Sequence, residues 1–319
     1  MTERRLYIPS IKTYVLAASK LKQGDIVSFP TETVYGLGAD ATNSSGVAKI
    51  YAAKERPSFN PLIVHLASAE KAQQYVKMNA LAQKLADKFW PGPFTMVLPL
   101  KENSGLSDLI SAGLDTVAVR VPKNDVAHSL LEHFDGPIAA PSANKSGNIS
   151  PTTAQHVDGE FGEELEMIID GGPCEKGIES TIVQIEGEQI IILRPGNITI
   201  SEIEAVTSEN VIFNAQSSDT PNSPGQLESH YAPNSKMRLN ASEVFSGECF
   251  LGFGECGPST VNLSPSGDLI EAAANLFSMM RKLDQMDFDT IAVAHIPPTG
   301  LGMAINDRLK RAAAPRDNK

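Results

Sequence analysis

The chain has 319 residues, a length that exceeds one ordinary domain and predicts two. Hydrophobic residues make up 41% and charged residues 20% of the sequence, as in globular proteins with packed cores. The formal net charge of −11 argues against tight, non-specific binding of nucleic acid over a broad surface, but not against a basic pocket in an acidic protein.

Residues 1–207 alternate helical and strand patterns and are expected to form a first, α/β domain. In chain order we expect a helix over 13–21, a strand over 25–29, a polar, glycine-containing turn over 30–39, a helix from Ser44 or Ser45 to 53, a strand over 62–66, helices over 69–76 and 80–89, strands over 94–98 and 117–121, a helix over 124–134, a strand over 138–140, a helix from Thr152 or Thr153, a strand over 167–169, a hairpin of strands 181–185 and 189–193, and a helix over 200–206.

Residues 208–234 are rich in Ser, Asn, Pro, Gln and Asp, a composition typical of a linker. Beyond them, residues 235–319 return to alternating patterns, with strands expected over 250–253, 261–263 and 291–294 and helices over 269–286 and 302–314. This alternation predicts a small, parallel, Rossmann-like α/β domain at the C-terminal end.

The three cysteines have the spacing of neither a zinc site nor a disulfide framework, which favours a reducing, cytoplasmic compartment. The N-terminus lacks the apolar core of a signal peptide, and no apolar run approaches transmembrane length. No histidine pair stands at metal-binding spacing, so we expect no protein-built metal site.

Two glycine motifs mimic nucleotide-binding fingerprints. Gly36–Ala41 fits the dinucleotide pattern, but Thr42–Gly46 does not open a helix at once and the ribose-binding acid is missing. Gly172–Gly177 has P-loop glycine spacing, but Ile178-Glu179 follows where a P-loop has Lys-Ser or Lys-Thr. A dinucleotide site and a Walker-type site are therefore not expected.

Polar residues recur where buried strands begin or end. Lys54, Arg56 and Asn60 precede an apolar strand that ends at His65, on what we expect to be a loop. Each residue taken singly has an ordinary explanation, as a surface cation, a turn former or a core histidine. Four cations at comparable places instead favour a site for an anionic ligand, because ligands of α/β sheets collect at strand ends. They are Lys54, Arg56, Arg120 and Arg194.

Ordered motifs along the chain resemble the YrdC-like family. They are Pro30-Thr-Glu-Thr-Val-Tyr-Gly-Leu-Gly38, Lys54-x-Arg-Pro-x-x-Asn-Pro-Leu62 with His65, Trp90-Pro-Gly-Pro93, Val119-Arg-Val-Pro122, Pro141-Ser-Ala-Asn-Lys-Ser-Gly147 and Leu193-Arg-Pro-Gly196. Ser223-Pro-Gly225 and His230-Tyr-Ala-Pro233 resemble the two-domain version, whereas Glu55 stands where the family often has a small residue. The resemblance implies an open, twisted mixed sheet with flanking helices around a cavity.

The resemblance also implies an activity: L-threonine, bicarbonate and ATP give L-threonylcarbamoyl-adenylate and pyrophosphate. The product would serve the tRNA threonylcarbamoyltransferase machinery, which modifies adenosine 37 in tRNAs that read codons starting with A. Mg²⁺ would accompany ATP with few or no direct protein ligands. The chain itself would have weak or no direct nucleic-acid binding and no membrane partner.

Matched to the family motifs position by position, two sets of site residues follow. The implied threonine contacts are Thr33, His65, Arg120 and Ser180, with the Arg120 fork on the carboxylate. The implied ATP contacts are Lys54, Arg56, Asn60, Thr116, Ala140, Ser142, Asn144, Ser150, Arg194 and Tyr231. Lys54 and Arg56 would be catalytic by neutralising phosphate charge. We further expect the 208–234 segment to fold back over the cavity, so that Tyr231 touches ATP.

Two other functions stay open. One is RNA binding, which the acidic charge and the missing aromatic–basic platform disfavour. The other is a carbamoyl-adenylate enzyme of the hydrogenase-maturation type, which shares the core domain but carries acylphosphatase and cysteine-rich zinc modules not seen here.

Overall fold

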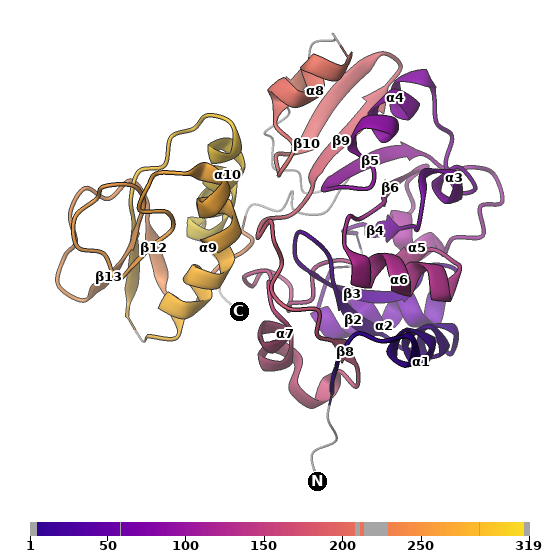
Figure 1. Ribbon diagram of the computed structural model, residues 1–319, viewed down its shortest axis with the longest axis horizontal. Coiled ribbons are helices and arrows are strands. Elements are labelled where there is room, and N and C mark those ends of the chain that lie inside the picture. Colours follow the sequence, from indigo (N-terminus) through magenta and orange to yellow (C-terminus); the bar gives the residue numbers. More distant parts are fainter. Residues whose placement is uncertain (1–4, 58, 208–210, 214–228, 287, 316–319) are drawn as a thin grey trace.

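The computed structural model describes residues 5–57, 59–207, 211–213, 229–286 and 288–315. Its strands form two separate sheets, one of eleven strands and one of four. Figure 1 shows the smaller unit beside the larger, with helices α9 (Leu269–Asp284) and α10 (Leu301–Ala313) between the two sheets. The predicted α/β class is therefore confirmed, whereas the domain boundaries at residues 207 and 234 stay predictions.

The larger sheet is mixed, and its spatial order differs from the chain order. The order is β1-β8-β2-β3-β7-β4-β6-β5-β9-β10-β11. At its centre β4 pairs parallel with β6 and antiparallel with β7. The strands are β1 (Leu6–Tyr7), β2 (Val27–Pro30), β3 (Tyr35–Asp40), β4 (Ile63–His65), β5 (Phe94–Pro99), β6 (Thr116–Arg120), β7 (Ile138–Ala139), β8 (Ile168–Ile169), β9 (Thr181–Glu186), β10 (Gln189–Arg194) and β11 (Val211–Phe213).

Helices flank this sheet, and polar caps set where several of them begin. Asn79 and Asn124 cap α4 and α6, and Thr153 caps α7. Asn43, rather than Ser44 or Ser45, caps α2, because its side chain accepts hydrogen bonds from the Ser45 and Gly46 amides. The helices are α1 (Ile11–Lys22), α2 (Ser44–Lys54), α3 (Ala69–Ala72), α4 (Ala80–Phe89), α5 (Asp108–Ser111), α6 (Asp125–Phe134), α7 (Ala154–Phe161) and α8 (Ile200–Thr207), with the 3₁₀ turn η1 (Gly162–Glu164).

One stretch expected to be a turn is a buried strand. Residues Tyr35–Asp40 form β3, which pairs antiparallel with β2. The glycines that suggested a turn are required by packing: a Cβ at Gly38 would lie 2.7 Å from Phe29 Cε1 and 3.0 Å from Ile138 Cγ2. Glycine lets these two side chains cover the strand.

The smaller unit is a parallel sheet with order β12-β15-β13-β14, as predicted for a Rossmann-like domain. Its strands are β12 (Lys236–Arg238), β13 (Glu248–Gly252), β14 (Val261–Asn262) and β15 (Thr290–Val293). Within the predicted linker, β11 adds a strand beside β10, which its Val-Ile-Phe sequence favours. Among the described residues, no helix has the length and apolar character needed to cross a membrane.

Candidate active site

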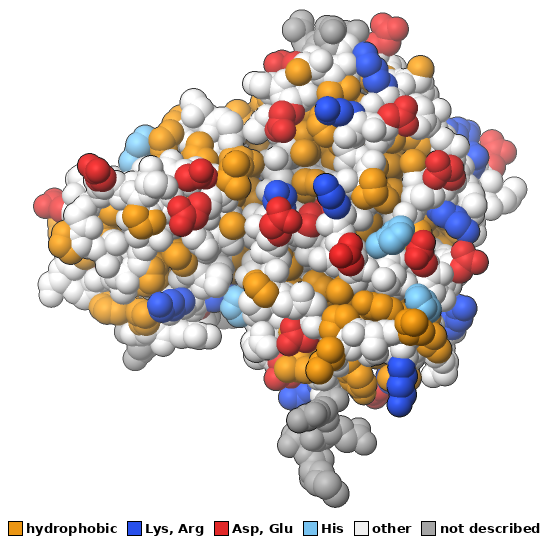
Figure 2. All heavy atoms as spheres, viewed as in Figure 1, with side chains coloured by type: hydrophobic (Ala, Val, Ile, Leu, Met, Phe, Trp, Pro, Cys, Tyr) orange, Lys and Arg blue, Asp and Glu red, His pale blue; other side chains and the backbone are white. Residues whose placement is uncertain are grey.

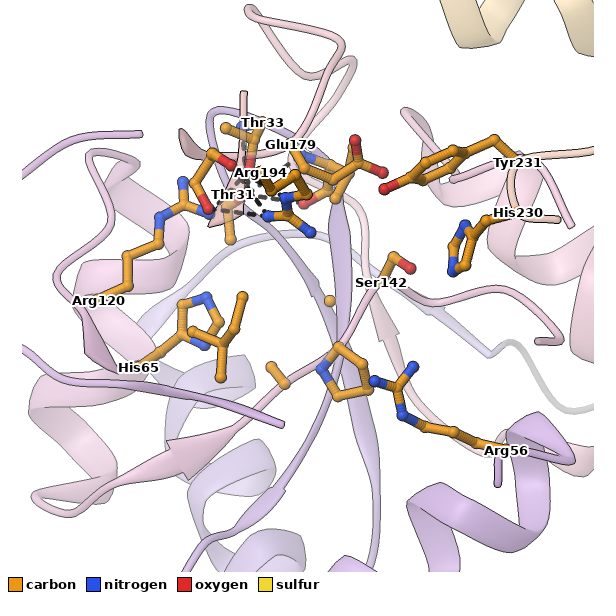
Figure 3. A pocket seen from close by; sticks show the side chains of 16 residues that line it. Thr31, Thr33, Arg56, His65, Arg120, Ser142, Glu179, Arg194, His230 and Tyr231 are labelled. Atoms are coloured by element: carbon orange, nitrogen blue, oxygen red, sulfur yellow. Dashed lines mark hydrogen bonds between the residues drawn. The ribbon is translucent and has the colours of Figure 1, made fainter. Parts of the chain in front are cut away.

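A pocket opens beside the adjacent strands β4 and β6, with an empty volume of about 520 Å³ that is partly open to solvent. Figure 3 shows Arg120 and His65 at one end of the pocket and Arg56, His230 and Tyr231 at the other. Its lining residues are Thr31, Thr33, Val34, Gly36, Arg56, Ile63, His65, Arg120, Ala140, Pro141, Ser142, Glu179, Ser180, Arg194, His230 and Tyr231.

Arg120 closes strand β6, and its buried guanidinium is held from several sides. Nε donates to the Gly92 carbonyl at 3.2 Å, and Nη1 donates to Thr33 Oγ1 at 3.0 Å. Nη2 lies 2.8 Å from Glu32 Oε2 as an ion pair, but without the angles of a hydrogen bond. Nη2 is therefore charged, fixed and still able to donate, as a receptor for a carboxylate requires.

His65 sits beside Arg120, since the two residues are register partners on β4 and β6. Burial, and then the positive charge of Arg120, lowers the pKa of His65 to about 3. The imidazole is thus neutral at physiological pH, and its Nδ1 has no hydrogen-bond partner among the described residues. A neutral ring in this position can exchange hydrogen bonds with a polar ligand without adding charge.

Arg56 brings positive charge to the other end. Its Nη2 donates to Asn60 Oδ1 at 2.6 Å and to the Pro61 carbonyl at 2.8 Å, and its Nε donates to the Asn60 carbonyl. Burial lowers the pKa of Arg56 to about 10, so the side chain remains protonated at neutral pH. Asn60 lies behind the pocket wall and orients Arg56.

Lys54 does not lie on an exposed loop, contrary to the sequence interpretation. It ends helix α2 and is 1% exposed, and its Nζ donates to the carbonyls of Ser142 and Asn144. Burial, and then the charge of Arg56, lowers its pKa well below the ordinary value. Because the side chain spans from helix to turn, Lys54 fixes the turn that carries Ser142 to the pocket.

Ser180 and Arg194 come from the neighbouring strands β9 and β10. Arg194 donates through Nε and Nη2 to the Ser180 carbonyl, and through Nη2 to Ser180 Oγ at 3.1 Å. Next to them, Glu179 Oε1 accepts a hydrogen bond from Ser150 Oγ at 2.6 Å. The wall between the two ends of the pocket is therefore a connected set of polar contacts.

Nine of the predicted site residues line the pocket: Thr33, Arg56, His65, Arg120, Ala140, Ser142, Ser180, Arg194 and Tyr231. Five others do not line it: Lys54, Asn60, Thr116, Asn144 and Ser150. Thr116 begins β6 four residues before Arg120. Asn144 instead supports its own turn, because its Nδ2 donates to the carbonyls of Lys145 and Asn148.

Sequence reasoning did not select three residues that the structure places at the site. Glu179 and His230 line the pocket, and Glu32 pairs with Arg120 behind it. Each is an immediate neighbour of a selected residue, Ser180, Tyr231 or Thr33. The signal that could have found them is that each is a charged or titratable side chain within a polar segment already assigned to the site.

Tyr231 reaches the pocket from within the predicted linker, residues 208–234. It is 1% exposed, its ring stacks on Phe277 with centroids 5.4 Å apart, and its hydroxyl has no hydrogen-bond partner among the described residues. The following residue anchors the segment, because the Ala232 amide donates to the Gly147 carbonyl at 2.8 Å. The predicted motif at 223–225 lies outside the described residues.

Comparison with known proteins identifies the family. Residues 19–196 match a family model described as Telomere recombination (Sua5, YciO and YrdC), and residues 198–314 match the C-terminal domain of threonylcarbamoyl-AMP synthase. The chain belongs to the Sua5 family of threonylcarbamoyl-AMP synthases. The threonylcarbamoyl-AMP synthase of Pyrococcus abyssi is 40% identical, with 94% of each chain covered, and that of Bacillus subtilis is 38% identical, with 94% of this chain and 92% of the other covered.

Solved structures agree with this family. The crystal structure of P. abyssi Sua5 complexed with L-threonine matches with a TM-score of 0.88 at 36% identity, over 97% of this chain and 96% of that one. Full-length HypF shares only the fold, at 20% identity and a TM-score of 0.52, with 30% of its own length covered. The Sua5 assignment thus accounts for both units of the chain.

Proposed function

We propose that this pocket joins L-threonine, bicarbonate and ATP to form L-threonylcarbamoyl-AMP and pyrophosphate. The observation that carries the proposal is one pocket with a carboxylate receptor at one end, Arg56 at the other and Arg194 on the wall between them (Figure 3). The amino acid would be taken by Arg120, Thr33, His65 and Ser180. The phosphates would be taken by Arg56 and Arg194. The P. abyssi relative solved with L-threonine supports threonine as that amino acid.

The proposed chemistry has two steps. The threonine amine is first carboxylated by bicarbonate to a carbamate, with loss of water. A carbamate oxygen then forms a bond to the α-phosphorus of ATP, and the bond to the departing pyrophosphate breaks. Arg56 and Arg194 would neutralise the charge that builds on phosphate oxygens, and the remaining polar wall would hold the reactants together. Tyr231 would contact ATP and cover it from solvent.

Mg²⁺ would arrive bound to the phosphates of ATP and supply further charge neutralisation there. The described residues contain no group of three or more His, Cys, Asp or Glu side chains placed to hold a metal ion. The two carboxylates nearest the site already face arginines, Glu32 towards Arg120 and Glu179 towards Arg308. This donor set fits a metal held mainly by the nucleotide.

We place the reaction in the cytoplasm, where the product would pass to the tRNA threonylcarbamoyltransferase machinery for modification of adenosine 37. Direct binding of RNA by this chain would be weak or absent. Figure 2 shows acidic and basic side chains interspersed over one face of the molecule, rather than a basic stripe there.

Pyrophosphate release tests the function directly. With Mg²⁺ and ATP present, we expect release only when both L-threonine and bicarbonate are supplied, with threonylcarbamoyl-AMP detected by chromatography. Release that is independent of threonine would contradict the proposal and favour carbamoyl-adenylate chemistry. Salt-resistant retention of tRNA in a filter-binding assay, without pyrophosphate release, would favour RNA binding instead.

A further inference from the structure

The C-terminal unit contributes one side chain that lies fully buried beside the pocket wall. Arg308 of α10 is 0% exposed, and its Nε donates to Glu179 Oε2 at 3.1 Å. Its Nη1 donates to the Pro195 carbonyl and to Asp307 Oδ2. The guanidinium carbon also lies 5.5 Å from the centre of the Tyr231 ring. One arginine therefore contacts both a wall residue and the tyrosine at the pocket.

The loop that carries Glu179 contacts the C-terminal unit at a second residue, Gly177. Gly177 has φ +70°, and a Cβ there would lie 2.3 Å from the Ala274 carbonyl oxygen and 2.5 Å from the Ala273 carbonyl oxygen of α9. The backbone of the loop thus packs directly against α9, in a conformation that favours glycine. Two helices of the C-terminal unit hold the loop between β8 and β9.

Contacts continue from this loop to the residues proposed to bind substrate. Glu179 accepts from Ser150 through its other oxygen, and the adjacent Ser180 is bonded to Arg194. Pro195, which Arg308 also contacts, directly follows Arg194. Through Glu179 and Pro195, Arg308 is therefore linked to Ser150 and Arg194, two of the implied ATP contacts.

We infer that Arg308 is a positioning residue through which the C-terminal domain sets the nucleotide end of the pocket. Its charge compensates the buried Glu179 carboxylate, so that Glu179 keeps its bond to Ser150 and stays clear of the phosphate-binding arginines. Without Arg308, the Glu179 carboxylate would pair with Arg194 instead, and Arg194 would then be less available to the phosphates. By linkage, ATP binding and seating of the C-terminal domain strengthen each other.

Relatives give this inference a setting. The Idiomarina loihiensis threonylcarbamoyl-AMP synthase aligns with 50% of this chain and with 85% of its own length, so proteins of this name include shorter chains. The inference rests on ATP and L-threonine being the ligands.

Calorimetry on the full chain tests the inference with ATP and L-threonine titrated separately. For Arg308→Met we expect the Kd for ATP to rise about tenfold, within the roughly 5- to 150-fold range of coupling between sites, and the Kd for threonine to change less. Arg308→Met combined with Glu179→Gln removes both charges, and we expect it to recover most of the ATP affinity. An unchanged ATP affinity in Arg308→Met, or no recovery in the double variant, would overturn the inference.

Arg281→Met is the matched control. Arg281 is the corresponding arginine of α9: it pairs across the interface with Glu160 at 3.2 Å and donates to the Ile149 carbonyl, and neither partner lines the pocket. We expect Arg281→Met to lower the unfolding temperature but to leave the Kd for ATP within about twofold, because Arg281 shares no contact with Glu179, Pro195 or Tyr231. Equal loss of ATP affinity in both variants would mean that Arg308 only helps to hold the two domains together, and would overturn the inference.

A second variant of Arg308 and the binding properties of the wild-type chain complete the test. If Arg308→Met does not fold, Arg308→Lys keeps the charge beside Glu179 but loses the fork to Pro195, and a smaller rise in the Kd for ATP is expected. Wild-type chain that binds neither ligand contradicts the proposed function and the inference together. Wild-type binding that no Arg308 variant alters contradicts the inference alone.

Discussion

At the scale of single residues, the site is built from arginines whose N–H donors mostly form hydrogen bonds within the protein before any ligand binds. Arg120 uses Nε and Nη1 for hydrogen bonds to Gly92 and Thr33, and its Nη2, ion-paired with Glu32, still has a hydrogen to donate in a fixed plane. Such an arrangement costs little rotamer entropy on binding, because the side chain is already ordered. Lysine is also a poor substitute for Arg120. Its ammonium group has no planar set of donors that could bond Gly92 and Thr33 and a ligand carboxylate at the same time.

Arg120→Lys is therefore expected to weaken threonine binding by about 1.5–3 kcal/mol, the range of a hydrogen bond to a charged group, and ATP binding by less. Calorimetry with each ligand alone measures both values. Arg56→Lys serves as the counterpart at the other end of the pocket and should weaken ATP more than threonine. Equal weakening of both ligands by Arg120→Lys would mean that the amino acid does not bind at this end.

At the scale of elements, the hairpin of β2 and β3 places Thr31 and Thr33 at the pocket. Strand β3 of the hairpin pairs with β7, and Gly38 leaves room there for the side chains of Phe29 and Ile138. Thr31 Oγ1 then donates to the Val34 carbonyl at 2.7 Å, which fixes the turn between the strands. Close packing within one element thus determines where a ligand-facing hydroxyl stands.

Gly38→Ala is expected to destabilise the fold by about 1–3 kcal/mol, because its methyl group would overpack against Phe29 and Ile138. Gly159→Ala is the matched control: Gly159 lies inside α7 with nothing within 4 Å of an added Cβ, and alanine should stabilise that helix by roughly 0.5–1 kcal/mol. Urea denaturation of both variants checks this pair. A Gly38→Ala protein as stable as the wild type would show that the strands can separate at no cost.

At the scale of the whole molecule, three histidines from distant parts of the chain are held neutral. Burial lowers the pKa of His65 to about 3 and that of His156 to about 4, and it lowers the pKa of His230 well below the ordinary value. Neighbouring arginines act in the same direction at all three positions. The folded chain therefore resists proton uptake that the unfolded chain accepts.

Acid should consequently destabilise the protein. The folded pKa values lie below the unfolded value of about 6.5, so stability is full above pH 6.5 and falls as pH drops, by up to about 1.4 kcal/mol per pH unit for each histidine. Urea denaturation between pH 8 and pH 5 measures the slope above the range of ordinary carboxyl titration. His156→Gln, outside the pocket lining, should make the slope shallower, and an unfolding free energy that stays constant from pH 6.5 to 5 would contradict the argument.

The sequence by itself determined what depends on neighbours along the chain. The Asn79 and Asn124 caps and the β9–β10 hairpin follow from local signals, and the ordered motifs were sufficient for the family. Nine of the residues carried over from those motifs line one pocket. Such features are readable because capping, turn chemistry and motif spacing act over a few residues.

Only the tertiary structure decided features that depend on contacts between distant segments. Tyr35–Asp40 carries turn-like glycines, yet β2, β7 and Phe29 make it a strand. Lys54 belongs to a polar motif, yet carbonyls 88 and 90 residues away bury it. Arg308 meets Glu179 across 129 residues, and nothing local in either segment predicts the other. Burial and charge compensation arise from the folded arrangement, which is why these roles could not be read along the chain.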